Sequence, residues 1–304
     1  MNAKSPLISV VTATYNRSNV LYYSLSLLQK QEFRDWECII VGDKCTDDTG
    51  NVVASFNENR FRFINLDENT GDQAGPNNYG CRLARGKYIA FLNHDDLWFP
   101  DHLSSMLQTM DSRNADLVYA MSAIVFRDEN VLVKGINEDG IYEPNIFVPA
   151  SAWLFRREML ESVGSWKSFK QTHCTPSQDW IVRSWKKKNK IIMNPRLTVL
   201  MVYSGLRPDS YKDREFEINK KLCNLILDNN GYRNELILRS LIESAGAESS
   251  MSFRKNMKRL IRGVVYKVLI KMGIPPLSVL NFIKYGIHGG FIQYLRVKRG
   301  LGKK

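Results

Sequence analysis

The sequence lacks several motifs by which nucleotide- and metal-binding proteins are identified. It has no GxGxxG and no GxxxxGK[ST], which excludes a dinucleotide fingerprint and a P-loop. Its five cysteines are widely spaced without a CxxC pair, so a zinc pattern is excluded and reduced thiols in or near the core are expected. No basic-then-apolar leader opens the chain and no uninterrupted apolar run reaches ~18 residues, which predicts a soluble or peripherally bound cytoplasmic protein.

Acidic residues are missing from one end of the chain. The 304 residues carry 43 Lys or Arg and 31 Asp or Glu, a net charge of +12. Thirteen of the basic residues and none of the acidic ones fall within residues 251–304, so the first 250 residues hold 30 basic and 31 acidic groups. The excess charge therefore belongs to the C-terminal segment, where it bears on partners and not on the fold.

What is present is a globular composition, 44% hydrophobic and 24% charged, with a strand-helix alternation over about the first 110 residues. Near-continuous apolar runs at residues 7–14, 36–42, 61–66 and 87–92 are the expected strands, with helical spacing between them. This pattern predicts an α/β fold with a mostly parallel central sheet flanked by helices. From about residue 115 short strands mix with irregular segments and a helix near 178–187, and from about 212 helices dominate.

Polar side chains follow three of the expected strands, at the ends where such sheets bind ligands. Because these strand ends meet at one edge of a sheet, we expect the side chains to converge on one crevice. A charged group there lies at the rim and stays ionised, which a buried position would make costly. The residues are Thr14, Tyr15 and Arg17 after the first strand, Asp43 after the second, and Asn93–Asp96 after the fourth.

Asp95 and Asp96 are adjacent carboxylates at the mouth of a strand. Mg²⁺ and Mn²⁺ prefer carboxylate oxygens and complete their shell with phosphate and water, so the pair suits a metal-diphosphate site. The same spacing fits a second interpretation, in which Asp96 caps the next helix and Asp95 is solvated. His94 is a third candidate contact, although a lone histidine more often packs or forms a hydrogen bond.

Two further aspartates each have a functional and a structural interpretation. Asp43 can accept hydrogen bonds from a nucleotide's ribose or base, or it can be satisfied by amides of its own loop. Asp179 lies in the first turn of a helix, where it is either a general base or a carboxylate that stabilises the helix dipole. The indoles of Trp180 and Trp185 are expected in the core more than as sugar-stacking platforms.

Four segments together resemble the family 2 glycosyltransferases, which have the GT-A fold. Each motif is weak alone, but four in the family's order and roughly its spacing are fairly specific. The resemblance covers about residues 5–205 and rests on "ISVVTATYNR", "IIVGDKCTDDT", "ENTGDQAGPNNYGCRLARGKYIAFLNHDDLW" and "SQDWIVRSW".

The resemblance implies a nucleotide-sugar site. Asp43 matches the aspartate that contacts the base or ribose. The first nucleotide-binding segment matches Thr14, Tyr15 and Arg17, and the glycine/asparagine turn near the nucleotide-sugar matches Gly75, Asn78 and Gly80.

The resemblance also implies a metal site and a catalytic base. Asn93–Asp95 stands where the family commonly has Asp-x-Asp, with Asp95 as the metal carboxylate, and Asp179 matches the catalytic base. Three positions depart from the family. Asn93 replaces the first aspartate, so the site has one charge less unless Asp96 compensates as a ligand. Gln178 stands where a glutamate is usual, and Asn77 where many relatives have arginine.

Arg207, in the loop after the last expected strand, is a candidate phosphate contact, with a solvated cation as the alternative. No histidine follows that strand, where some relatives supply another metal ligand.

The implied activity is inverting, metal-dependent transfer of a sugar from a nucleotide-diphosphate sugar to a glycan or lipid-linked acceptor, in bacterial cell-surface polysaccharide biosynthesis. Mn²⁺ or Mg²⁺ is the implied cofactor. The alternative is a non-catalytic nucleotide-sugar-binding or membrane-scaffolding protein. The substitutions at Asn93 and Gln178 favour that alternative, whereas the presence of Asp95 and Asp179 favours the enzyme.

We divide the chain into a GT-A catalytic domain, 1–210, and a helical extension, 211–304, which is basic and amphipathic from about residue 251. The extension's apolar stripe either docks on the catalytic domain or lies in an anionic membrane surface, which would place the protein at the inner face of the cell membrane. The membrane is favoured because it would hold a lipid-linked acceptor. No nucleic-acid partner is expected, since no recognised module accompanies the charge. The stripe is Met257, Leu260, Ile261, Val264, Val265, Val268 and Met272.

Overall fold

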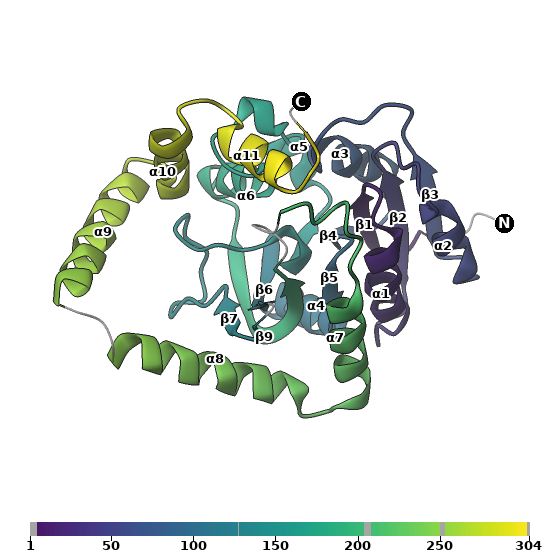
Figure 1. Ribbon diagram of the computed structural model, residues 1–304, viewed down its shortest axis with the longest axis horizontal. Coiled ribbons are helices and arrows are strands. Elements are labelled where there is room, and N and C mark those ends of the chain that lie inside the picture. The colour runs from purple at the N-terminus through teal and green to yellow at the C-terminus, as the bar shows by residue number, and fades with distance from the viewer. Residues whose placement is uncertain (1–4, 127, 204–207, 250–252, 303–304) are drawn as a thin grey trace.

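One mixed sheet forms the centre of the computed structural model, which describes residues 5–126, 128–203, 208–249 and 253–302. Its strands are β1 (Ile8–Thr14), β2 (Trp36–Gly42), β3 (Phe61–Asn65), β4 (Tyr88–Phe91), β5 (Asp96–Trp98), β6 (Leu117–Val125), β7 (Val131–Lys134), β8 (Trp153–Arg156) and β9 (Ile191–Val202). In space the order is β3-β2-β1-β4-β8-β6-β9-β5, with β7 paired to β6. Figure 1 shows β3, β2, β1 and β4 in this order.

Helices flank this sheet and then leave it. They are α1 (Ser18–Gln29), α2 (Thr49–Ser55), α3 (Ala74–Leu83), α4 (His102–Ser112), α5 (Met159–Val163), α6 (Pro176–Lys186), α7 (Glu217–Asp228), α8 (Tyr232–Ser249), α9 (Phe253–Lys271), α10 (Pro276–Tyr285) and α11 (Gly290–Lys298). α3 packs on β1 and β2, α4 packs on β6 and β9, and α5 packs on α6. From α8 onward the chain arches away from the body, and α11 returns to it (Figure 1).

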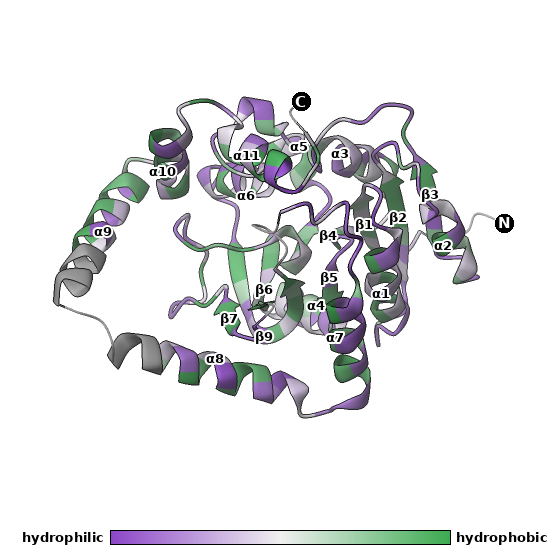
Figure 2. Cartoon of the chain, in the orientation of Figure 1, coloured by the Kyte–Doolittle hydropathy of each residue, from purple (hydrophilic) through white to green (hydrophobic). Residues whose placement is uncertain are grey.

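The first four predicted strands are confirmed and form the parallel half of the sheet. β1 pairs in parallel with both β2 and β4, and β2 with β3. The side chains of β1, β2 and β4 are mostly buried on both faces, which explains the unbroken apolar runs of their sequences, whereas β3 at the edge of the sheet is partly exposed (Figure 2). The parallel arrangement ends at β4, because its next neighbour β8 is antiparallel. The α/β class and the C-terminal helices agree with the prediction.

Asp96 does not cap a helix, so the structural alternative for this residue is wrong. Asp96 opens the short strand β5, which pairs antiparallel with β9, and α4 begins only at His102. Leu97 and Trp98 are fully buried, and the indole Nε1–H of Trp98 donates to the carbonyl of Ser151 at 2.7 Å. Burial of these two apolar side chains therefore holds the segment extended.

Close packing of α3 on β1 requires a glycine. A Cβ at Gly80 would lie 2.4 Å from Cγ1 of Val11, well inside contact distance. The helix therefore approaches the strand through Gly80, and its N-terminal turn is brought to the same edge of the sheet as the C-terminal end of β1.

The extension begins inside the core and ends outside it. Leu222 and Cys223 of α7 and Leu236 of α8 are buried in a cluster with Leu27 and Leu97 of the body. The apolar stripe on and just after α9 is not docked, since its described members remain 47% to 66% exposed; they are Ile261, Val264, Val265, Val268 and Met272. Met257 and Leu260 lie in a stretch whose side chains the structure does not describe. The division at residue 210 stays a prediction.

Candidate active site

The carboxyl ends of β2, β1 and β4 lie side by side, as the sequence predicts. The backbone N–H of Asp43 donates to the carbonyl of Thr14 at 2.8 Å, and Nδ1–H of His94 donates to the carbonyl of Ala13 at 3.2 Å. Polar residues from both neighbouring strands are thus bonded to the end of β1. The hydroxyl of Thr14 is buried there without a hydrogen-bond partner in the described part of the chain.

Asp43 holds the turn that precedes α3. One carboxylate oxygen accepts from the backbone N–H and the hydroxyl of Thr70, at 2.7 and 2.8 Å, and the other accepts from the N–H of Gly71 at 3.1 Å. The side chain is 4% exposed. Local amides therefore satisfy much of this carboxylate, and any contact with a nucleotide would use its remaining lone pairs or the turn that it shapes.

Within the segment Asn93–Asp96, the two acidic side chains are in different surroundings. The carboxylate of Asp96 is buried and accepts from the amide of Asn93 at 2.8 Å and from the hydroxyl of Ser151. Burial, with the charge of Asp95 next to it, raises the pKa of Asp96 to about 7. The side chain of Asp95 is 25% exposed, and its Oδ2 lies 3.9 Å from Nε2 of His94.

These surroundings distinguish the predicted metal ligands. Asn93 and Asp96 are bonded to each other and to Ser151, whereas Asp95 stays accessible at the strand end. Burial lowers the pKa of His94, which favours its neutral form. In the described residues no three His, Cys, Asp or Glu side chains form a ready-made metal cage.

The predicted residues of α3 face the turn and the segment before α6. A Cβ at Gly75 would lie 2.4 Å from the side chain of Thr70, so a larger residue would displace the turn that Asp43 holds. The amide of Asn78 donates to the carbonyl of Trp166 at 2.9 Å and accepts from its N–H at 2.8 Å. Asn78 thus connects α3 to the chain that leads into α6.

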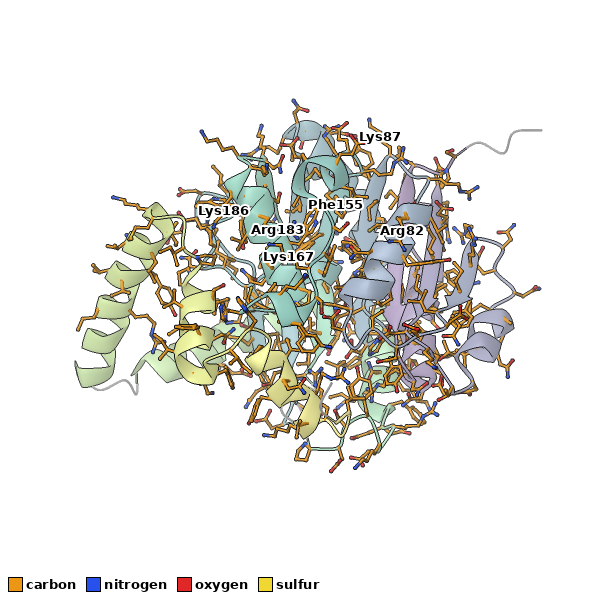
Figure 3. The ribbon with its side chains drawn as sticks, turned by 90° about the horizontal axis from the view of Figure 1, so that it is seen from above. Arg82, Lys87, Phe155, Lys167, Arg183 and Lys186 are labelled. Carbon is orange, nitrogen blue, oxygen red and sulfur yellow. The ribbon has the colours of Figure 1, made fainter. Side chains whose placement is uncertain are left out.

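Asp179 lies in the first turn of α6, with its side chain 19% exposed. Its Oδ2 forms a 2.7 Å ion pair with Nε of Arg183, one turn later on the same helix. Figure 3 labels Arg183 on this helix. Arg183 is itself fixed by donating to the carbonyls of Val163 and Ser165. The preceding residue, Gln178, is 3% exposed and donates to the hydroxyl of Tyr142 at 3.1 Å, so it is a packing residue.

The chain before α6 is fixed to the strand-end region. The carboxylate of Asp72 accepts from the backbone N–H of Phe169 at 2.6 Å and from the hydroxyl of Ser168 at 3.0 Å. Asp72 follows the turn held by Asp43. The helix that carries Asp179 is therefore joined to the same turn as the nucleotide candidates, through contacts that span nearly 100 residues of sequence.

The remaining candidates of the first segment are Tyr15, which is half-buried, and Arg17, which is 6% exposed. Arg17 donates to the carbonyl of Ser210 at 2.7 Å, and its guanidinium lies 5.1 Å from the ring centroid of Tyr211. Arg207 lies outside the described residues. Sequence reasoning missed Tyr211 and the C-terminal arginines beside it, because no spacing connects them to the strand ends.

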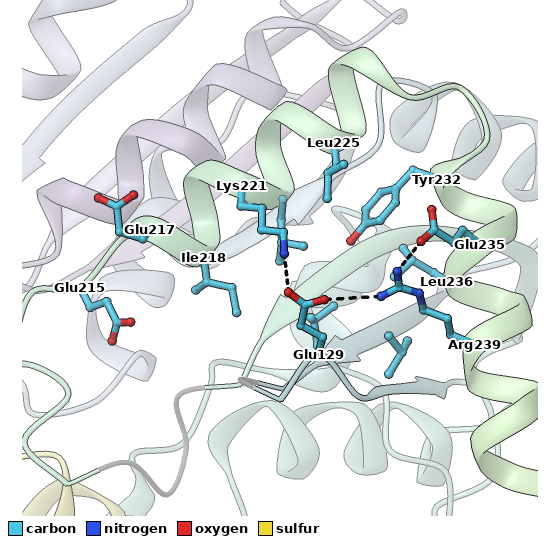
Figure 4. Close-up of a pocket in the computed structure, with 13 residues that line it drawn as sticks. Glu129, Glu215, Glu217, Ile218, Lys221, Leu225, Tyr232, Glu235, Leu236 and Arg239 are labelled. Atoms are coloured by element: carbon cyan, nitrogen blue, oxygen red, sulfur yellow. Dashed lines mark hydrogen bonds and ion pairs between the residues drawn. The ribbon is translucent and has the colours of Figure 1, made fainter. Parts of the chain in front are cut away.

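A groove elsewhere in the molecule is distinct from this site. It has a volume of about 650 Å³ and lies between α7, α8 and the β6–β7 hairpin (Figure 4). Glu129 crosses it, paired with Lys221 and, at 3.9 Å, with Arg239. None of its lining residues is among the predicted site residues.

Comparison with known proteins agrees with the sequence and the fold. The chain is 29% identical over 119 residues to the UDP-Glc:alpha-D-GlcNAc-diphosphoundecaprenol beta-1,3-glucosyltransferase WfgD of Escherichia coli, a match that covers 39% of this chain and 47% of that protein, about half its length.

Two solved structures share the fold at 15% sequence identity. S. aureus TarS 1-349 in complex with UDP-GlcNAc has a TM-score of 0.56, with 97% of this chain and 83% of TarS covered. The mannosyltransferase PcManGT from Pyrobaculum calidifontis, in complex with GDP-Man and Mn2+, has a TM-score of 0.53, with 93% and 87% covered. The profile of the family described as Glycosyl transferase family 2 matches residues 9–164, more than half of the sequence, and the chain belongs to this family.

Proposed function

We propose that this glycosyltransferase acts with inversion, moving a sugar from a nucleoside-diphosphate sugar to a glycan or lipid-linked acceptor in bacterial surface polysaccharide assembly. The observation that carries the proposal is the meeting of Asp43 and the Asp95 segment at the ends of adjacent parallel strands, with the Asp179 helix fixed to the same turn. The donors in the TarS and PcManGT structures and the lipid-linked acceptor in the E. coli relative's name support the substrate classes.

The chemistry assigned to the chain is a single displacement. The acceptor oxygen forms a bond to the anomeric carbon, the bond from that carbon to the diphosphate oxygen breaks with its electron pair, and the hydroxyl proton passes to Asp179. Oδ2 of Asp179 is engaged in the ion pair with Arg183. Oδ1 is then the oxygen we assign as the base, while the ion pair fixes the orientation of the carboxylate.

The proposed divalent cation is Mn²⁺ or Mg²⁺, with Asp95 as its protein ligand. Such ions are commonly held by one or two carboxylates together with substrate phosphates and water, which the single accessible carboxylate of Asp95 fits. When bound, the ion would offset negative charge on the leaving diphosphate. Asn93 and Asp96 would not contact the ion and would instead hold the Asp95 segment in place, because their side chains are hydrogen-bonded to each other and to Ser151.

Replacement of Asp95 by alanine tests the metal assignment. We expect at least ~10-fold weaker binding of UDP or GDP in the presence of Mn²⁺, and little change without the ion, because the lost group acts through the metal. Calorimetric titration with and without Mn²⁺ measures both. Asp67→Ala, an exposed position with the same change of charge, is the control. Equal loss of affinity with and without Mn²⁺ would refute a metal role for Asp95.

Donor hydrolysis separates the enzyme from a non-catalytic binding protein. Incubation with UDP-GlcNAc, UDP-glucose or GDP-mannose and Mn²⁺ should release nucleoside diphosphate slowly, since water can replace an absent acceptor. Tight binding of a nucleotide-sugar without release, in the presence of candidate acceptors as well, would favour the binding protein.

The proposed partner of the extension is an anionic membrane surface. No single described helix is long and apolar enough to span a membrane. The segments Ile261–Lys271 and Pro276–Tyr285 have the required length and apolar composition only when they are taken together, and the chain bends by 109° between them. Apolar and cationic side chains are exposed together on α9 and α10, an arrangement that suits the membrane interface. They include Val264, Val268, Phe282 and Ile283, and the cations Arg262, Lys267, Lys271 and Lys284.

Vesicle binding tests this surface. We expect the protein to sediment with vesicles of about 30% anionic phospholipid and to be released by high salt, because each cation near the surface contributes ~1 kcal/mol. The double variant Val268→Asp/Ile283→Asp should bind at least ~10-fold more weakly, since it places charge in the apolar face. Ile136→Asp, 59% exposed on the body, is the matched control. Equal losses in both variants would argue against a dedicated membrane face.

A further inference from the structure

The C-terminal extension returns to the strand ends where the donor is proposed to bind. The N–H of Gly289, just before α11, donates to the carbonyl of Thr172 at 2.7 Å. Gly289 has a φ of +69°, and a Cβ there would lie 2.6 Å from the ring of Phe169, so the close contact depends on glycine. α11 is thus fixed against the segment that leads into α6, as its position in Figure 1 indicates.

The other end of α11 is bonded to the chain around Tyr211. The N–H of Asp209 donates to the carbonyl of Lys298 at 2.9 Å, and the N–H of Tyr211 donates to that of Arg299 at 3.3 Å. Arg296 donates to the carbonyl of Gly71, in the turn whose N–H bonds to Asp43. Two arginines from the end of the chain therefore reach the turn and the tyrosine at the strand ends.

Three guanidinium groups gather around Tyr211. Arg17 lies against its ring at 5.1 Å, and the charges of Arg299 and Arg296 act on its hydroxyl together with that of Asp95. Burial raises the pKa of this hydroxyl, so Tyr211 stays neutral and adds no counter-charge. The charges that act on this hydroxyl therefore include three arginines and one carboxylate, that of Asp95.

The hydrogen-bonding capacity of this cluster is not satisfied. The Nε–H groups of Arg17, Arg296 and Arg299 are buried without a partner in the described part of the chain, and Arg17 is 94% removed from solvent. A buried cation such as Arg17 is unfavourable unless an anion joins it, and the half-buried Arg296 and Arg299 each keep one buried donor unused. Planar guanidinium groups bind phosphate oxygens with particular strength and geometry.

We propose that Arg296 and Arg299, together with Arg17, bind the diphosphate of the sugar donor, so that the C-terminal extension completes the donor site. This rests on the proposed function. Asp43, Thr14 and the segment that carries Asp95 lie at the same edge of the sheet. Because Asn93 stands in place of an aspartate, this site would hold a metal ion less strongly. The arginines would then supply additional positive charge beside the diphosphate. They would also stabilise the charge that develops on the departing diphosphate.

Binding of phosphate-bearing probes without added divalent cation tests the proposal. Calorimetric titration of the full chain with UDP, GDP and inorganic pyrophosphate should show ~10- to 100-fold weaker UDP or GDP binding for Arg296→Ala and for Arg299→Ala. Uridine and guanosine, which lack phosphate, should bind all variants alike. Arg113→Ala, an exposed position just after α4, removes the same charge and should leave the affinities unchanged.

Controls separate binding from folding and from the choice of ligand. Arg299→Lys keeps the charge without the planar fork and should recover only part of the affinity, with thermal unfolding unchanged. Unchanged UDP and GDP affinities in both alanine variants would overturn the proposal. Wild-type protein that binds pyrophosphate through these arginines but no nucleoside diphosphate would overturn the donor function, and would assign the cluster to another diphosphate such as that of a lipid-linked acceptor.

Discussion

Replacement of Asp179 by asparagine is expected to lower glycosyl transfer by ~10²–10⁴-fold and to leave donor affinity almost unchanged. This is the usual contribution of a general base, and an amide cannot accept the hydroxyl proton. Asparagine has nearly the same shape, and its carbonyl oxygen can still accept from Nε of Arg183. Turnover with a supplied acceptor and titration with UDP or GDP measure the two effects separately.

Charge and helix stability must be separated from proton transfer in this experiment. An acidic residue in the first turn stabilises a helix by ~0.3–1 kcal/mol, so the variant should be slightly less stable. Glu161→Gln, exposed on the neighbouring α5, removes the same charge without touching the proposed base. If Asp179→Asn turns over as fast as Glu161→Gln, the carboxylate is not the base and the proposed mechanism is wrong.

The three inner strands of the parallel half, β1, β2 and β4, were predictable from sequence because both of their faces are mostly buried. Unbroken apolar runs place β1, β2 and β4 within about one residue of their observed bounds. β5 was not predictable in the same way. It has three residues and opens with Asp96, whose partner Ser151 is 55 residues away, so only tertiary contacts explain why a carboxylate is buried there.

The candidate site was predictable where residues follow strand ends, and not where the chain returns from a distance. Asp43 and His94 follow β2 and β4, the two strands that pair with β1, and both residues form hydrogen bonds to the end of β1. The order of the strands alone implies this proximity. Arg296 bonds to Gly71 across 225 residues, and no spacing or periodicity in a basic tail distinguishes it from the cations that face solvent. The helical stripe of α9 was correctly located, but its exposure depends on how the tail arches over the body.

Replacement of Trp180 by alanine is expected to destabilise the fold by ~3–5 kcal/mol, the usual effect of removing a buried aromatic side chain. The residue is fully buried, with ring centroids 5.8 Å from Trp153 and 4.9 Å from Phe155, both on β8. Its indole N–H donates to the carbonyl of Gly164 at 2.9 Å. For a domain of this size the melting temperature should fall by roughly 6–20 °C.

Trp185 provides the matched control on the same helix, because it is only partly buried. Trp185→Ala should lower the melting temperature much less, and Trp180→Phe should fall between, since it keeps a ring but loses the hydrogen bond to Gly164. Because Trp180 directly follows Asp179, its packing on β8 also fixes the proposed base relative to the sheet. If Trp180→Ala instead raised the KM for the donor at unchanged melting temperature, the indole would be a sugar-stacking platform and not an anchor of α6.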